Sequence, residues 1–297
     1  MPNFLVAESE TVDERDERRR AAGKSSGETY AATLRHMQPD CTVTIVASAD
    51  ADAELYKPAD LQRFDAVFVT GSPMHVYDDT PEVRRQLAFM RSVFASGTPS
   101  FGSCAGLQLA VAAAGGKVRK IPGRMEAGIA RRITPTEAGR DHPLLSGRPP
   151  SWDAAAIHGD EVETLPDGAT LLASNGVTQV QAAEIRYDRG IFWGVQYHPE
   201  LALGEIAVAL RRQVDSLIEA GLADTADDVN LRADQLEALH RDAGRLSLRW
   251  LLGVDGQLAE EDLRRTELKN FLACLSSLRL PDQQFEESPG EKIDQAA

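Results

Sequence analysis

The stretch Thr98-Pro-Ser-Phe-Gly-Ser-Cys104-Ala-Gly-Leu-Gln-Leu-Ala110 predicts a short strand, a tight turn and a helix in immediate succession. Within it, Gly102-Ser103-Cys104-Ala105-Gly106 has the form G-x-C-x-G, the nucleophile-elbow pattern with cysteine in place of serine. Glycines suit this turn because bulkier neighbours would collide around a strained backbone. The helix N-terminus after the turn favours a thiolate and offers N–H groups to an oxyanion. Cys104 also fits a small buried hydrophobic residue, so its partners must decide its role.

Strand-like and helix-like segments alternate through the first part of the chain. We expect strands at Phe4–Ala7, Val43–Ala47, Ala66–Thr70 and Ser100–Gly102, and helices that begin near Ser25 and span Pro81–Ser96 and Gly106–Ala114. Ala66–Thr70 is a continuous apolar run, which is typical of a strand buried on both faces of a parallel sheet. The alternation predicts an α/β fold with an open, mostly parallel sheet and helices on both faces.

The pattern changes after residue 128. Short strand-like runs, split by Gly and Pro, predict a mixed or antiparallel extension of the same sheet over residues 129–195, and Gly204–Ala220 predicts a helix. Further helical segments are expected near Asp228–Gly244, Leu246–Leu252 and Glu260–Leu278, and residues 283–297 have the composition of a disordered tail. We therefore divide the chain into residues 1–220 and an acidic helical C-terminal extension, residues 221–297. The extension is expected to pack on its own domain, on a second copy in a homodimer, or on a partner.

A histidine and a glutamate two residues apart follow an apolar run. The run from Ile191 to Glu200 predicts a strand that ends in His198-Pro199-Glu200. Residues two apart on a strand share a face, so the imidazole and the carboxylate would point into one site. An imidazole oriented by a carboxylate is the arrangement that activates a thiol. Alone, the pair also fits a surface histidine near an acid; with the cysteine turn, it predicts a Cys104-His198-Glu200 triad.

Composition and charge exclude several classes of protein. The 297 residues carry 32 basic and 46 acidic side chains, so the net charge is 32 − 46 = −14, which disfavours nucleic acid and anionic membrane as partners. No apolar run is long enough to span a membrane, and three widely spaced cysteines form no disulfide framework, so we expect a cytoplasmic protein. Gly23-Lys24-Ser25 is not a phosphate-binding loop, because Arg18 stands where that motif needs glycine. We expect no organic cofactor and no catalytic metal.

Four motifs, in order, carry a resemblance to a known family. They are Val69-Thr-Gly71-Ser-Pro, Phe101-Gly-Ser-Cys104-Ala-Gly-Leu-Gln108, His158-Gly-Asp-Glu-Val and Gly194-Val-Gln-Tyr-His198-Pro-Glu200. Over about residues 40–205 the chain resembles the class I glutamine amidotransferases, in particular the amidotransferase domain of GMP synthase. The resemblance implies a flavodoxin-like α/β fold. It also implies hydrolysis of the side-chain amide of L-glutamine through a γ-glutamyl thioester.

The resemblance also assigns roles to individual residues. Cys104 is the implied nucleophile, His198 the base and then the acid, and Glu200 the group that orients the imidazole. The implied oxyanion hole is formed by the N–H groups of Gly71 or Ser72 with Ala105. The implied contacts to the substrate come from Gln108, His158, Gly159 and Asp160. Without the resemblance, Gly71 fits an ordinary turn, Gln108 a polar residue lining its helix, and His158 a structural histidine. His75, Tyr77, Asp78 and Asp79 fit either the entrance or a solvated loop.

Three functions remain open from the sequence. The first is a glutaminase that passes ammonia to a separate synthase, because the residues after Ala220 are too few for an ATP-pyrophosphatase domain. The second is a free-standing γ-glutamyl amide or peptide hydrolase or transferase. It is motivated by Ala105, where relatives often carry a larger side chain, by Ile157, where many carry a small polar residue, and by Gly71-Ser72-Pro73 in place of two glycines. The third is a catalytically silent assembly protein that recruits a partner, against which the intact triad argues.

Overall fold

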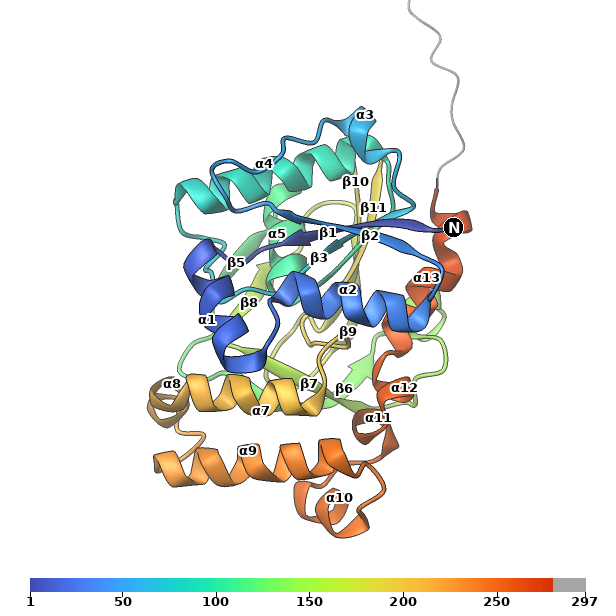
Figure 1. The fold of residues 1–297 in the computed structure, drawn as a ribbon. Helices are drawn as coiled ribbons and strands as arrows, with labels where there is room; N and C mark the ends of the chain where they lie inside the picture. Colours follow the sequence, from blue (N-terminus) through green and yellow to red (C-terminus); the bar gives the residue numbers. More distant parts are fainter. Residues whose placement is uncertain (280–297) are drawn as a thin grey trace, which may run out of the picture.

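A nine-stranded sheet forms the centre of the molecule, in the strand order β2-β1-β3-β4-β11-β10-β9-β6-β7 (Figure 1). The computed structural model describes residues 1–279, and the tail predicted at 283–297 lies outside them. The first five strands in this order pair in parallel: β1 (Asn3–Glu8), β2 (Thr42–Ala47), β3 (Ala66–Val69), β4 (Ser100–Ser103) and β11 (Gly190–Val195). Antiparallel strands continue the sheet: β6 (Glu126–Pro135), β7 (Trp152–His158), β9 (Ala169–Ser174) and β10 (Ala182–Tyr187). The predicted α/β sheet with an antiparallel extension is confirmed.

A second, two-stranded sheet was not expected from the sequence. It pairs β5 (Lys117–Lys120) with β8 (Asp160–Thr164) in an antiparallel ladder. β5 is short and carries three basic residues in four, so it lacks the apolar pattern of a buried strand. The sheet places the start of β8, at Asp160, close to the helix that follows Cys104.

Helices cover both faces of the large sheet, as predicted. α4 (Pro81–Ser96) and α5 (Ala105–Ala113) cover one face, and α2 (Ser26–Met37) and α13 (Thr266–Leu278) cover the other. α2 begins at the expected capping box, because the Ser25 hydroxyl accepts from the Glu28 N–H and the Glu28 carboxylate accepts from the Ser25 N–H. α4 matches its predicted bounds because Thr80 caps its start and Gly97 its end.

The helix predicted over Gly204–Ala220 is two helices, α7 (Leu203–Arg212) and α8 (Val214–Glu219). They separate at Gln213, whose N–H bonds to the carbonyl three residues back rather than four and so tightens the turn. The remaining helices include α1 (Val12–Ala22), in which Arg15 is buried against Glu8 and Asp50. Short segments complete the core part: α3 (Pro58–Leu61), α6 (Glu137–Arg140) and a 3₁₀ turn at Pro143–Leu145.

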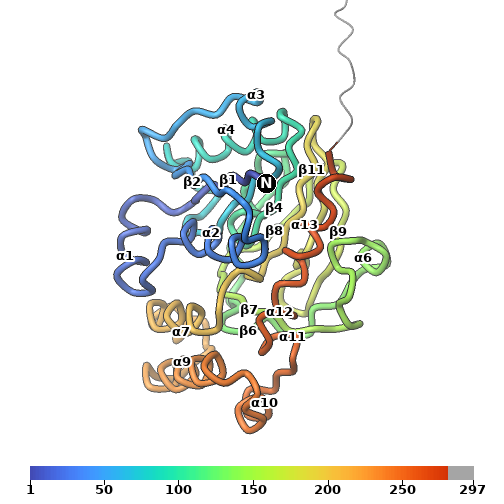
Figure 2. The backbone as a smooth tube through the Cα atoms, turned by 45° about the vertical axis from the view of Figure 1, so that its right-hand side comes forward, coloured from blue at the N-terminus to red at the C-terminus, as the bar shows by residue number. Residues whose placement is uncertain are grey.

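The C-terminal extension packs on its own chain. α9 (Ala226–Arg241) lies along α7, and α10 (Leu246–Leu252), α11 (Gly256–Ala259) and α12 (Glu261–Arg264) return the chain to the sheet (Figures 1 and 2). Apolar side chains from both parts share one cluster, among them Leu203, Ile206 and Leu210 of α7 and Val229, Leu236 and Leu239 of α9. The extension therefore completes the hydrophobic core instead of lying apart from it.

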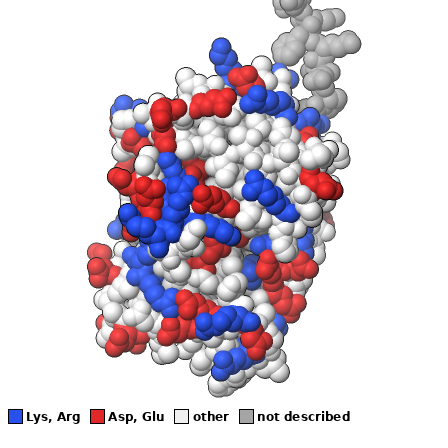
Figure 3. Space-filling view, viewed as in Figure 1, with Lys and Arg blue, Asp and Glu red and all other residues white. Residues whose placement is uncertain are grey.

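The charged surface is mixed in sign. On the face in Figure 3, Lys and Arg side chains are interleaved with Asp and Glu. Ion pairs such as Arg19 with Glu28 and Arg211 with Glu237 bring side chains of opposite charge together. Within residues 1–279 no helix has the length and apolar character needed to cross a bilayer.

Candidate active site

Cys104 sits on a strained turn between β4 and α5. Its φ of 53° and ψ of −112° lie outside the regions that non-glycine residues usually adopt. The Cys104 N–H donates to the Val195 carbonyl at 2.8 Å and so ties the turn to β11. A Cβ at Gly102 would lie 2.9 Å from the Gly106 carbonyl carbon, and one at Gly106 would lie 2.3 Å from the Val69 oxygen. Gly102 and Gly106 are thus required because neighbouring atoms lie too close for a side chain at either position, as expected from the sequence.

His198 and Glu200 meet beside this turn. Glu200 Oε1 lies 2.8 Å from His198 Nδ1, and the imidazole and Cys104 both lie beside Gly71. Burial alone would lower the pKa of His198, but the Glu200 charge and the thiol raise it from 6.5 to about 10. β11 ends at Val195, so the two side chains do not share a strand face as expected; a loop brings them together.

Gly71, directly after β3, lies against the same pair. A Cβ built on Gly71 would stand 2.8 Å from His198 Cε1 and 3.5 Å from Cys104 Cβ. Only glycine allows the backbone to come this near. The N–H of Ala105, the first residue of α5, has no acceptor within its own helix because the first N–H groups of any helix lack one. The Ser72 hydroxyl accepts from the Met74 N–H at 3.1 Å, which shapes the loop after β3.

The residues predicted to hold the substrate are joined by buried hydrogen bonds. Gln108 Nε2 donates to the Asp160 carbonyl and to Gln196 Oε1, each at 3.2 Å. His158 Nδ1 lies 2.9 Å from the Asp160 carbonyl, and its Nε2 lies 3.2 Å from Glu126 Oε2. Both nitrogens of His158 thus face protein oxygens, the arrangement of a structural histidine. A Cβ on the intervening Gly159 would meet no heavy atom within 4 Å, so this glycine borders open space.

Asp160 is held by two of the proposed entrance residues. His75 Nδ1 lies 2.6 Å from Asp160 Oδ2, and the Tyr77 hydroxyl donates to Asp160 Oδ1 at 3.1 Å. The rings of His75 and Tyr77 stack with centroids 5.3 Å apart. Burial and the Asp160 charge raise the pKa of Tyr77 to about 12, so its hydroxyl stays a donor. Asp79 instead pairs with Arg84 at the surface.

Sequence reasoning missed a buried carboxylate under the site. Glu126 accepts hydrogen bonds from Asn175, Thr178 and Gln181 in addition to facing His158. Burial raises the pKa of Glu126, but His158 foremost, and then Asn175 and Thr178, outweigh it and the net shift is downward. No motif marks Glu126 in the sequence, whereas Gln196 lies inside the Gly194–Glu200 motif and was available to notice. Across residues 1–279, no three His, Cys, Asp or Glu side chains are grouped so that they would hold a metal.

Comparison with known proteins places this geometry in a family. The model of the glutamine amidotransferase class-I family matches residues 22–214. The chain belongs to the class I glutamine amidotransferases. A solved glutamine amidotransferase from Thermotoga maritima has the same fold, with a TM-score of 0.64 at 16% identity over 92% of this chain and 97% of that one. The resemblance inferred from four motifs is therefore confirmed, as is the fold class.

Two proteins of similar sequence differ in how much of their own length aligns with this chain. A gamma-glutamyl-L-1-hydroxyisopropylamide hydrolase from Pseudomonas sp. is 34% identical over 275 residues, which are 91% of this chain and 91% of that protein. A glutamine-hydrolysing GMP synthase from Leifsonia xyli is 29% identical over 214 residues, 70% of this chain but only 39% of the synthase. The chain is thus an amidohydrolase of the class I family, and it spans well under half the length of the GMP synthase relative.

Proposed function

We propose that this amidotransferase-family chain is a free-standing hydrolase of small γ-glutamyl amides. The observation that carries the proposal is the full-length match to a hydrolase of that class, since 91% of both chains is aligned, extension included for the most part. The GMP synthase match covers a minor part of the synthase. Most of this chain and most of that hydrolase therefore correspond, whereas the larger part of the synthase lies outside its match to this chain.

The proposed nucleophile is Cys104, with His198 as its proton carrier. The imidazole takes the thiol proton, and the thiolate attacks the side-chain carbonyl carbon of the γ-glutamyl amide. As the C–N bond breaks, the imidazolium gives its proton to the departing amine and a γ-glutamyl thioester remains. Water, deprotonated by His198, then cleaves the thioester to glutamate and restores the thiol. The pKa of about 10 at His198 supports the first step, because it favours the imidazolium beside a thiolate.

The proposed oxyanion hole is the N–H of Gly71 or Ser72 together with that of Ala105. Gly71 supports this role by its closeness to Cys104 Cβ and His198 Cε1. The position of Ala105 at the N-terminus of α5 supports it as well, because the N–H groups and the dipole at a helix N-terminus stabilise a bound negative charge such as an oxyanion. N–H groups fixed by a turn stabilise a tetrahedral oxyanion without reorganising during the reaction.

The proposed site for the glutamyl head group is formed by Gln108, His158, Gly159 and Asp160. Asp160 is 7% exposed, and its carboxylate is positioned by His75 and Tyr77, which suits it to an α-ammonium group. The hydrogen bonds from Gln108 and His158 to the Asp160 carbonyl hold this loop against α5. The small side chain of Ala105, next to the proposed nucleophile, favours an amide substituent larger than the hydrogens of glutamine.

A second candidate is a glutaminase subunit that supplies ammonia to a separate synthase. The matches to GMP synthases favour it, and the same triad would serve it. In this case glutamine would be the preferred substrate, and turnover by the isolated chain would be slow. The third possibility, a silent assembly protein, is disfavoured by the intact Cys104, His198 and Glu200 constellation.

The test is amide hydrolysis by the purified chain alone. L-Glutamine and γ-glutamyl amides of small amines, γ-glutamyl-L-1-hydroxyisopropylamide among them, are compared by glutamate release, with Cys104→Ala as the control. We expect substituted amides to have a kcat/KM at least tenfold above that of glutamine, and Cys104→Ala to be inactive. A preference for glutamine would support the glutaminase instead, and full activity of Cys104→Ala would contradict the mechanism.

A further inference from the structure

The segment from Gln196 to Leu201 carries His198 and Glu200 but belongs to no strand or helix. Two of its N–H groups bond to the sheet: that of Gln196 donates to the Gln181 carbonyl at 2.9 Å, and that of His198 donates to the Ala155 carbonyl at 2.8 Å. The positions of the two catalytic side chains therefore depend on what else holds this loop. We call residues 196–201 the catalytic loop.

The C-terminal extension holds the catalytic loop just before His198. The Tyr197 hydroxyl donates to Glu267 Oε1 at 2.8 Å, and both side chains are fully buried. Glu267 in turn forms a two-fold ion pair with Arg148, in which Nε and a terminal nitrogen each lie 2.7 Å from a carboxylate oxygen. Burial, then the Glu267 charge, raises the pKa of Tyr197, so the hydroxyl remains protonated and can donate.

The extension also holds the loop just after Glu200. Arg264 is 4% exposed, and its Nε donates to the Leu201 carbonyl at 3.1 Å. Another of its nitrogens donates to the Leu258 carbonyl at 2.8 Å, so the guanidinium spans the loop and α11. Burial lowers the pKa of Arg264 to about 10, which still leaves a cation at neutral pH. A buried cation bound to carbonyl oxygens fixes them firmly, because releasing them would leave the charge without partners.

The same part of the extension supports the strands that lead into the site. The Phe271 ring packs 5.5 Å from Phe68, 5.4 Å from Phe101 and 5.8 Å from Trp193, measured between centroids. These rings belong to β3, β4 and β11, the strands followed by Gly71, Cys104 and the catalytic loop. The extension thus contacts each of the three strands that deliver the site.

We propose that Glu267 and Arg264 are positioning residues that hold His198 and Glu200 against Cys104 by fixing the two ends of the catalytic loop. The inference rests on the proposed function only in taking these three residues as the reactive group. Glu267 and Arg264 lie beyond residue 214, where the family match ends, so the family's shared motifs do not include them. The extension is accordingly part of the catalytic apparatus.

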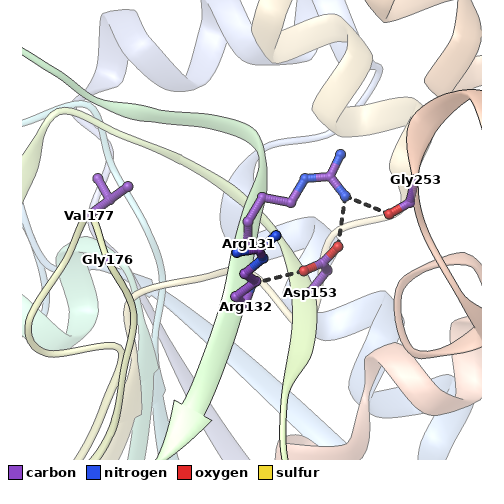
Figure 4. A pocket seen from close by; sticks show the side chains of 6 residues that line it. All are labelled: Arg131, Arg132, Asp153, Gly176, Val177 and Gly253. Atoms are coloured by element: carbon purple, nitrogen blue, oxygen red, sulfur yellow. Dashed lines mark hydrogen bonds and ion pairs between the residues drawn. The ribbon is translucent and has the colours of Figure 1, made fainter.

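The test removes single contacts from the loop. Tyr197→Phe deletes one hydroxyl and leaves the Arg148–Glu267 ion pair in place, while Glu267→Gln and Arg264→Met remove the groups in the extension. Arg131→Met is the matched control, because Arg131 of β6 binds the Leu252 and Gly253 carbonyls of the extension and pairs with Asp153 of β7, and within residues 1–279 no hydrogen bond joins its side chain to residues 196–201 (Figure 4).

Two readouts separate positioning from stability. The first is the rate at which iodoacetamide alkylates Cys104, followed on the Cys104 peptide by mass spectrometry, which needs no substrate. The second is kcat and KM for a γ-glutamyl amide, at a temperature where circular dichroism shows each variant folded. We expect Tyr197→Phe to lower the alkylation rate and kcat together by at least fivefold with KM within twofold, and the Glu267 and Arg264 variants to lower them further. Arg131→Met stays within twofold of the parent in both.

The outcomes distinguish this inference from the proposed function. The positioning role would be overturned if folded Tyr197→Phe kept the parent's alkylation rate and kcat. It would also be overturned if Arg131→Met lowered both quantities as much as Tyr197→Phe does. If the parent protein hydrolyses no γ-glutamyl amide, the proposed function fails, and the alkylation rates alone then support or refute the positioning of the loop. Should Glu267→Gln not fold, Tyr197→Phe still decides, because it deletes only the oxygen that Glu267 binds.

Discussion

His198 is a buried histidine whose pKa depends on the neighbouring Glu200 and Cys104. Burial acts to lower its pKa, and the Glu200 carboxylate and the Cys104 thiol reverse this to give a value of about 10. Above that pH the imidazole is neutral and has no proton for a departing amine. By linkage, the raised pKa stabilises the fold fully below pH 6.5, and this contribution is lost as the pH rises toward about 10.

Glu200→Gln keeps the shape of the side chain and removes its charge. Because only the Cys104 thiol then opposes the effect of burial on the pKa of His198, we expect the alkaline limb of kcat/KM to move down by at least one pH unit and kcat to fall by about 10²-fold. The measurement is the pH dependence of γ-glutamyl amide hydrolysis between pH 5 and roughly 10. Glu163→Gln, on an exposed part of β8, is the control and leaves the profile in place. An unchanged alkaline limb in Glu200→Gln would show that Glu200 does not set the protonation of His198.

At the scale of single elements, the turn between β4 and α5 requires the backbone at Gly106 to pack directly against the backbone at Val69. This packing leaves no room for a side chain at residue 106. Gly106→Ala would put a methyl group 2.3 Å from the Val69 oxygen, which is backbone and cannot rotate away. We expect this variant to lose about 1–3 kcal/mol of unfolding free energy and most of its activity, because β3 and α5 must separate around Cys104. Chemical denaturation and hydrolysis assays measure both.

Gly176→Ala provides the comparison for this variant, since a Cβ at that position meets no heavy atom within 4 Å. It should change the unfolding free energy by less than about 0.5 kcal/mol, in the range of ordinary surface substitutions. Equal losses in both variants would mean that the added methyl group acts through the backbone flexibility of glycine and not through the collision at Val69.

The elements that sequence could predict are those with local signals. Pro81 predicted the start of α4 and the Ser25–Glu28 capping box the start of α2, because such signals act within a few residues. β5 and β8 were missed because their pairing joins residues at least 40 positions apart and neither strand has an apolar period of its own. Cys104, His198 and Glu200 were found through motifs and do meet in the structure, although through a loop. Glu126 was missed because its importance comes from four partners that only the fold brings together.

At the scale of the whole molecule, the residues before and after position 220 differ in composition but share the same hydrophobic clusters. Leu268 and Phe271 of α13 belong to the same hydrophobic cluster as Phe68, Phe101 and Trp193 of the sheet. Figure 2 shows α13 running beside the sheet while α9 and α10 lie under α7. The sequence division into residues 1–220 and 221–297 stays a prediction about organisation, and we argue that it does not mark a boundary of stability.

Phe271→Ala tests whether the chain unfolds as one unit. The substitution removes a fully buried ring from contact with Phe68, Phe101 and Trp193, so we expect a loss of about 3–5 kcal/mol of unfolding free energy. Tryptophan fluorescence, measured in a Trp250→Phe background so that only Trp152 of β7 and Trp193 of β11 contribute, reports on the sheet, and circular dichroism reports on all helices, including those of the extension. If extension and sheet share one core, the two signals shift together to lower denaturant and stay superimposed. Two separated transitions, with helix lost before Trp193 is exposed, would instead make the extension an independent unit and would weaken its assignment as part of the catalytic apparatus.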